Sequence, residues 1–164
     1  HDLATSNANV WALALSNTRL VGGGSFGAVN PAIGIGLWNT PTAFSTARAP
    51  DVLLASTAGT FSSNDFVADV ACERDRGLLA AAVQNLSNQR LLVWENLAVA
   101  GASTAPSFSG SLPSSPKRVF SLETRHYVLT QGEVAIFEHP LAGTTLRTVA
   151  TLTGAAFTDF AFAR

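Results

Sequence analysis

One pattern recurs along this chain of 164 residues and limits what it can fold into. An apolar segment meets a short polar turn that ends in arginine, and a second apolar segment follows. Ser, Thr, Asn and Asp favour tight turns because their side chains bond to nearby backbone groups, so each copy is predicted to form a β-hairpin. The three copies read WALALSNTRLVG, ADVACERDRGLLA and RVFSLETRHYVL, which makes Arg19, Arg76 and Arg125 equivalent.

Two more apolar segments follow each hairpin. The third reads IGIGLWN, RLLVWEN and EVAIFEH, with Trp38, Trp94 and Phe137 at one position, and the fourth lies at 51–56, 107–112 and 146–152. Four strands in about 40 to 50 residues are typical of a β-propeller blade. The sequence therefore predicts an all-β fold of four-stranded antiparallel sheets, with blades at 10–56, 66–112 and 118–152. The alanine-rich segment 78–89 favours a helix by composition, but its place in the repeat predicts a strand and then a loop.

The repeat stops early. FTDFAFAR at 157–164 is similar to FVADVACER, so an extra strand is expected at 157–162, with Asp159 equivalent to Asp69. Propellers close with about four to eight blades, and three blades would leave apolar sheet faces uncovered. We expect residues 1–164 to form a single partial propeller that is completed by a second copy or another chain, or that packs against something else. The His1 start and the absence of Met indicate a cleaved chain or a multi-chain assembly.

Composition excludes several classes of function. Charged residues make up 13% of the chain and the net charge is -1, so no basic surface for nucleic acid is expected. Gly, Pro, Asn and Ser interrupt the apolar runs before the roughly 20 residues of a membrane helix. The single cysteine, Cys72, lies in an apolar run and is predicted to be a buried hydrophobe rather than a reactive thiol.

Two segments carry a resemblance to a known family: GLWNTPTAFSTARAPDVLLAS and SNQRLLVWENLAVAGASTAPSFSGSL. They resemble bacterial exported propellers related to the NHL-repeat family, whose blades read Asn-Asn-Arg, two apolar residues and Trp-Asn, then a loop and Ala-Asp-Val-Val-Leu-Gly. Residues 88–94 follow the first part, and 38–39 with 49–54 follow the rest, whereas the third blade has Phe137 for the Trp. The resemblance implies a propeller fold and a secreted, periplasmic or cell-surface setting. It also implies a scaffold or ligand-binding role and no catalytic residue.

Two motifs suggest chemistry that their context disfavours. GGGSFG at 22–27 fits both the nucleophile elbow G-x-S-x-G and the dinucleotide loop G-x-G-x-x-G. Both mechanisms need a helix directly after the turn, and AVNPAIGIG cannot form one, so we expect a loop between the second and third strands. His1 could begin a copper site, but His126 and His139 lack ligand spacing, so His1 is interpreted as a terminus left by truncation or by a tag. His126 and His139 are interpreted as ordinary histidines at a sheet edge.

The remaining candidates are repeat positions. The arginines could bind an anionic or sugar ligand on one face of the ring, or pair with Glu73, Asp75 or Glu123, and pairing is favoured because repeat positions usually encode the fold. Trp38 and Trp94 could stack on a sugar, although burial within the blades is favoured. Asp69 and Asp159 could line a channel and hold a cation, but two carboxylates are too few to predict a metal site.

The expected function is a non-enzymatic binding or assembly module that is completed by itself or by another protein, with carbohydrate as a further ligand class. The candidate ligand-binding residues are Arg19, Arg76, Arg125, Trp38 and Trp94. No catalytic residue, metal or cofactor is predicted. The alternatives are a hydrolase or lyase with its active site at the propeller channel, and a structural subunit of a surface assembly.

Overall fold

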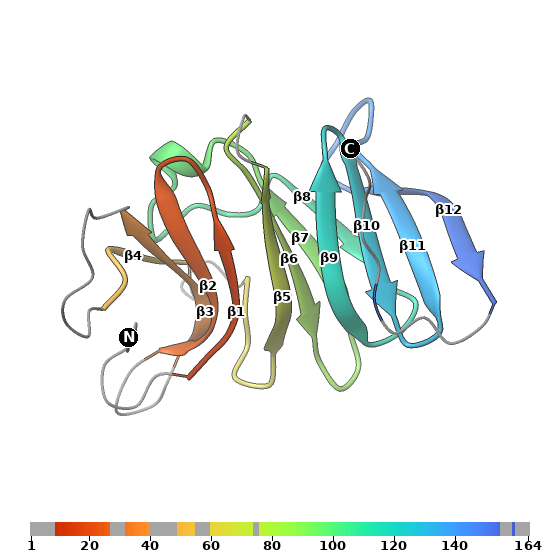
Figure 1. Ribbon diagram of the computed structural model, residues 1–164, viewed down its shortest axis with the longest axis horizontal. Coiled ribbons are helices and arrows are strands. Elements are labelled where there is room, and N and C mark those ends of the chain that lie inside the picture. The colour runs from red at the N-terminus through yellow and green to blue at the C-terminus, as the bar shows by residue number, and fades with distance from the viewer. Residues whose placement is uncertain are drawn as a thin grey trace.

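The described part of the chain forms three four-stranded antiparallel sheets, as predicted from the repeat (Figure 1). The computed structural model describes residues 9–26, 32–39, 49–54, 60–73, 76–154 and 159. The first sheet contains β1 (Asn9–Leu15), β2 (Arg19–Phe26), β3 (Ala32–Asn39) and β4 (Val52–Leu54). The second contains β5 (Phe66–Glu73), β6 (Leu78–Gln84), β7 (Arg90–Trp94) and β8 (Phe108–Ser111). The third contains β9 (Pro116–Leu122), β10 (Arg125–Thr130), β11 (Glu133–Glu138) and β12 (Arg147–Thr153).

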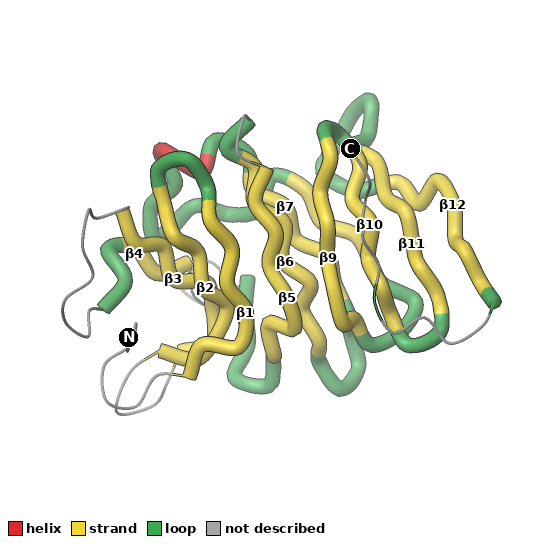
Figure 2. The backbone as a smooth tube through the Cα atoms, viewed as in Figure 1, coloured by secondary structure: helices red, strands yellow, loops and turns green. Residues whose placement is uncertain are grey.

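The three sheets stand side by side, joined along their first strands. β5 contacts β1 on one side and β9 on the other, and each sheet continues in chain order from its first strand to its fourth. This is how blades are arranged in a propeller. A short helical segment, the 3₁₀ helix η2 (Leu97–Val99), lies in the connector after β7 (Figure 2). No helix within the described ranges is long and apolar enough to cross a membrane.

The predicted hairpins are present, and their turns lie at one end of the sheets (Figure 1). In the first turn the Ser16 hydroxyl accepts a hydrogen bond from the Arg19 N–H at 2.9 Å, which is the local bonding expected of a turn serine. The other two turns use backbone with positive φ, at Gly77 (62°) and at Glu123 (56°).

The strand register confirms one predicted equivalence and corrects another. Trp38, Trp94 and Phe137 occupy the same position, since they pair with Leu20, Leu79 and His126 on the second strand of their sheets. Arg19 and Arg125 are both the first residue of a second strand. Arg76 is not equivalent to them, because it lies in the turn and Leu78 is the first residue of β6.

The glycine-rich segment is a strand, where a loop was predicted. Residues 22–26 belong to β2, and Gly27 lies outside the described residues. The glycines make room for Trp38. A Cβ on Gly36 would lie 2.8 Å from Trp38 Cη2, and a Cβ on Gly22 would lie 3.0 Å from Trp38 Cζ3. Only glycine allows the indole to lie this close to two neighbouring strands.

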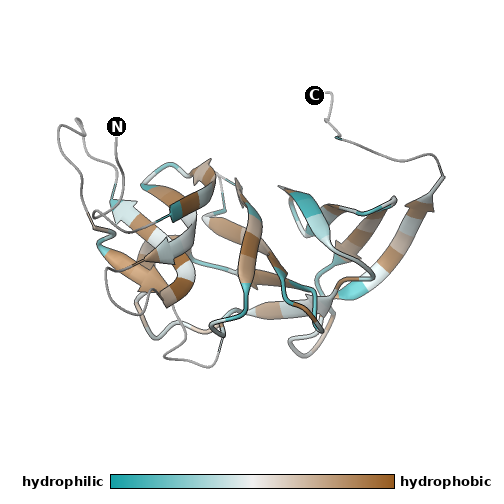
Figure 3. Ribbon diagram, turned by 90° about the horizontal axis from the view of Figure 1, so that it is seen from below, coloured by the Kyte–Doolittle hydropathy of each residue, from teal (hydrophilic) through white to brown (hydrophobic). Residues whose placement is uncertain are grey.

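The core consists of two apolar layers between the sheets. β6 is buried from Leu78 to Val83, and its side chains alternate between the two layers, because the second sheet is covered on both faces. Figure 3 shows hydrophobic stretches along strands of all three sheets. Fully burying each large apolar side chain, such as Leu79 or Val93, contributes about 1.5–3 kcal/mol.

A connector between the third and fourth strands ties each later sheet to the sheet before it. In the second sheet this connector is residues 95–107, and its carbonyls at Ala98 and Ala100 accept hydrogen bonds from the Arg19 guanidinium of the first sheet. In the third sheet it is residues 139–146. There Ser109 of β8 donates to the Thr144 carbonyl and accepts from the Leu146 N–H. In both joints, therefore, the connector belongs to the later sheet and bonds to the earlier one.

The segment 78–89 begins as strand β6 and continues as a turn, as predicted. The predicted extra strand at 157–162 lies outside the described residues except for Asp159, and His1 lies outside them as well.

Candidate ligand and association surfaces

Two of the predicted ligand-binding arginines serve the fold. The Arg19 guanidinium donates to Ala100 O at 3.0 Å and to Ala98 O at 2.9 Å, and the residue is buried. Arg125 is exposed and forms an ion pair with Glu138 at 3.2 Å, rather than with the expected Glu123. Arg147 binds the other oxygen of Glu138 at 2.6 Å, and the two guanidinium groups hold the pKa of Glu138 below its ordinary value.

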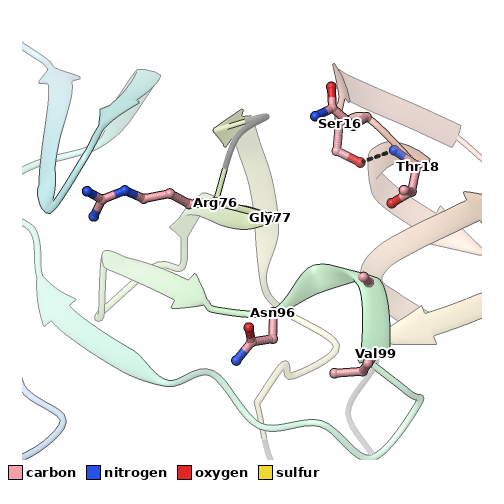
Figure 4. Close-up of a pocket in the computed structure, with 8 residues that line it drawn as sticks. Ser16, Thr18, Arg76, Gly77, Asn96 and Val99 are labelled. Carbon is pink, nitrogen blue, oxygen red and sulfur yellow. Dashed lines mark hydrogen bonds between the residues drawn. The ribbon is translucent and has the colours of Figure 1, made fainter.

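Arg76 is the predicted arginine that borders a pocket. It is exposed, and no ion pair with a carboxylate is found for it among the described residues. It borders a pocket of about 340 Å³ between the turn ends of the first two sheets. Figure 4 shows its guanidinium pointing away from Ser16 and Thr18. The pocket is lined by Ser16, Asn17, Thr18, Arg76, Gly77, Asn96, Ala98 and Val99.

The predicted tryptophans are not available for stacking on a sugar. Trp38 and Trp94 are both 0% exposed, and the Trp94 indole N–H donates to Thr104 O at 3.1 Å. They are core residues, which is the interpretation the sequence favoured. Among the described residues, Trp11 and Phe66 are exposed aromatic side chains, and their rings stack across β1 and β5 with centroids 4.4 Å apart. No periodic pattern in the sequence marks this pair, because Trp11 lies at a register shift in β1.

Carboxylates of β5 bind the backbone of β9. Asp69 accepts a hydrogen bond from the Val119 N–H at 2.9 Å, and Glu73 accepts one from the Glu123 N–H at 3.0 Å. Burial raises the pKa of Asp69. Asp159, the predicted equivalent of Asp69, has its Oδ1 atom 3.9 Å from Nε of Arg118. Within the described ranges no group of three or more His, Cys, Asp or Glu residues is placed to hold a metal ion.

The single thiol is suited to packing rather than to chemistry. Cys72 is partly buried against the apolar layer between the first two sheets, and burial raises its pKa to about 12. A thiol with so high a pKa forms almost no thiolate at neutral pH, and the thiolate is the reactive species.

A polar cluster lies at the joint between the second and third sheets, and the sequence did not reveal it. The His126 ring contacts the Ser121 hydroxyl and the His139 ring, each at 2.9 Å. The contact between Ser121 and His126 has the composition of an activated nucleophile. However, burial, with His139 next to it, lowers the pKa of His126 to about 3, so this ring is a poor base at neutral pH.

The two outward faces of the array are partly apolar. The first-sheet face is the face of the first sheet that carries Trp38, and Leu13 and Leu15 on it are 53% and 48% exposed. The third-sheet face is the side of the third sheet turned away from the second, and Leu122 and Leu152 on it are 49% and 52% exposed. On the first-sheet face Trp38 is fully buried, whereas Leu13 and Leu15 are about half exposed, so this face is covered in part.

The outer edge of the third sheet differs from that of the second. The connector 139–146 covers part of β8 through Ser109. All seven residues of β12 are exposed, and in the described part of the chain no such connector lies on this strand. An exposed edge strand offers unpaired backbone groups to another chain.

A scan against protein-family models finds no match for this chain, and a search of curated proteins finds none either. The resemblance to NHL-repeat propellers therefore stays a prediction.

Proposed function

We propose that this protein is a binding and assembly module that associates head to tail through the first-sheet and third-sheet faces, and that it has no catalytic role. The observation behind the proposal is that the joint between sheets is built twice in the same direction. In the first joint the Trp94 face of the second sheet packs on the face of the first sheet that lies opposite Trp38. In the second joint the Phe137 face of the third sheet packs on the face of the second sheet that lies opposite Trp94.

The two outward faces are the halves of such a joint that no other sheet of the described residues covers. The first-sheet face carries Trp38 and is the kind of face that packs on an earlier sheet. The third-sheet face is the kind that receives a later one. Leu122 and Leu152 on this face are about half exposed, and Ile136 on the same face is partly buried. The third-sheet face of one copy can therefore pack against the first-sheet face of a second copy. Such a contact between unlike faces is a head-to-tail association.

The exposed edge of β12 is also consistent with a second copy of this chain as the partner. A later sheet would bring a connector to this edge, as the third sheet brings Thr144 and Leu146 to Ser109 of β8. The association would then combine apolar burial on the sheet face with backbone hydrogen bonds at the edge.

Two variants, each with one blocked face, test the proposal. Leu13→Glu with Leu15→Glu blocks the first-sheet face, and Leu122→Glu with Leu152→Glu blocks the third-sheet face. All four leucines are about half exposed, so a glutamate at these positions can reach water. Sedimentation velocity should show that each variant alone is a single chain, because burying an unpaired carboxylate prevents the contact. An equimolar mixture should form a two-chain complex through the two intact faces.

The control is Leu86→Glu, since Leu86 is 94% exposed and lies in a turn away from both faces. This variant should associate as the unmodified protein does. Association of one blocked variant with itself would show a contact between like faces. A mixture that stays as single chains would refute the proposal.

A further inference from the structure

The cluster at His126 replaces an apolar layer that the other two sheets keep. The residues of the first and second strands that pair beside the aromatic position are Leu15 and Leu20 in the first sheet, and Cys72 and Leu79 in the second. In the third sheet they are Ser121 and His126. His126 is 0% exposed and lies on the face that packs against the second sheet. A leucine would satisfy this position by packing alone, so the polar pair needs another explanation.

The cluster extends across the joint between the sheets. His126 Nδ1 lies 2.9 Å from Ser121 Oγ, and His126 Nε2 lies 2.9 Å from His139 Nε2. The His139 ring lies over Phe108 of β8 with centroids 4.3 Å apart. Its Nδ1 lies 4.0 Å from Glu95 Oε1, directly after β7. His139 therefore connects the cluster to Phe108 and Glu95 of the second sheet and its connector.

One arrangement of protons satisfies the whole chain of contacts when both rings are neutral. Ser121 donates to His126 Nδ1, His126 Nε2–H donates to His139 Nε2, and the remaining His139 proton, on Nδ1, faces the Glu95 carboxylate. With both rings charged, two N–H groups would oppose each other at 2.9 Å. The bond between the rings would then be lost, and a charge would remain in an apolar layer.

We propose that the His126–His139 pair is a pH-sensitive lock that holds the third sheet against the second while both rings are neutral and releases it when acid protonates them. The charged groups that face the pair are Glu73 from β5, Arg76 from the turn before β6, and Glu95 after β7. The two carboxylates favour a proton on His139 and the guanidinium opposes it. His139 therefore takes the first proton, because His126 is fully buried.

The direction of the pH effect follows from the pKa values. Burial, followed by the neighbouring His139, lowers the pKa of His126 from 6.5 to about 3, and burial also lowers the pKa of His139. A histidine whose pKa is lower in the folded state binds more protons when unfolded. Its stabilising effect is complete above 6.5 and is lost as the pH falls from 6.5 toward about 3.

The test is to give the third sheet an apolar layer like those of the other two. Ser121→Ala with His126→Leu removes the buried ring and its hydroxyl partner together. The equilibrium constant of unfolding is measured by urea titration at about pH 7.5 and about pH 4.5. Between these two pH values the equilibrium constant for folding should fall about a hundredfold more in the unmodified protein than in the variant. The reason is that His126 stays neutral in the folded protein at two pH units below its unfolded pKa.

Asp69 and Glu138 also titrate in acid, but they are present in both proteins, so their effects cancel in the comparison. An equal pH dependence in the two proteins would overturn the proposal.

Measurements on the unmodified protein keep the proposal testable if the variant does not fold. Imidazole ¹⁵N chemical shifts should show His126 neutral with its proton on Nε2 at about pH 6, and a charged ring there would contradict the lock. Amide protection factors, which correct for the intrinsic pH dependence of exchange, should fall in β9–β12 at a higher pH than in β1–β4 as acid is added. An equal fall in both sheets would also refute it.

Discussion

At the residue scale, Trp38 fits into the first sheet because two facing positions have no side chain. A Cβ on Gly36 would lie 2.8 Å from its Cη2, and a Cβ on Gly22 would lie 3.0 Å from its Cζ3. Trp38 is fully buried, so the ring cannot move aside at low cost. We predict that Gly36→Ala destabilises the protein by about 1–3 kcal/mol through overpacking. Gly101→Ala is the matched control, because nothing lies within 4 Å of its added Cβ. Urea unfolding of both variants checks this, and equal stabilities would contradict it.

Single residues were predicted well from the sequence only where the repeat placed them. Trp38, Trp94 and Phe137 were recognised as one position because each follows the same apolar pattern. The bond between His126 and His139 could not be predicted, because it joins one strand to the residue after the next strand. A histidine at a position filled by leucine in the other sheets was the available signal.

At the element scale, the connector 95–107 is attached to the first sheet through Arg19. Its guanidinium makes two hydrogen bonds to backbone carbonyls from a buried position. Arg19→Met keeps most of the apolar stem and should destabilise the protein by about 1.5–3 kcal/mol, because the carbonyls lose a charged donor. Arg147→Met is the control, since an exposed ion pair contributes at most about 1 kcal/mol. Hydrogen exchange at residues 97–100 should increase only in the first variant, and unchanged exchange there would contradict this role of Arg19.

The strands were predicted more accurately than the turns, and turn length explains the error at Arg76. The three hairpin turns span 16–18, 74–77 and 123–124, so they differ in length. Matching the arginines of the three copies assumed turns of fixed length, and this displaced Arg76 from the position that Leu78 occupies. Turns vary in length because their side chains face water, whereas strands are held in register by the layers on both faces.

At the scale of the whole molecule, the apolar composition of the strands indicated sheets covered on both faces, and the second sheet is covered in this way. The pocket beside Arg76 could not be predicted, because it forms where two turns and η2 from different sheets meet. The direction of the joints also depends on the structure, since the contacts of Arg19 and Ser109 join residues that are distant in sequence.

Head-to-tail association requires the two outward faces to be halves of one joint. Light scattering coupled to gel filtration, over a series of protein concentrations, measures the mass in solution. Head-to-tail association predicts masses above 17.0 kDa that approach whole multiples of it as the concentration rises. A mass of 17.0 kDa at every concentration would contradict it.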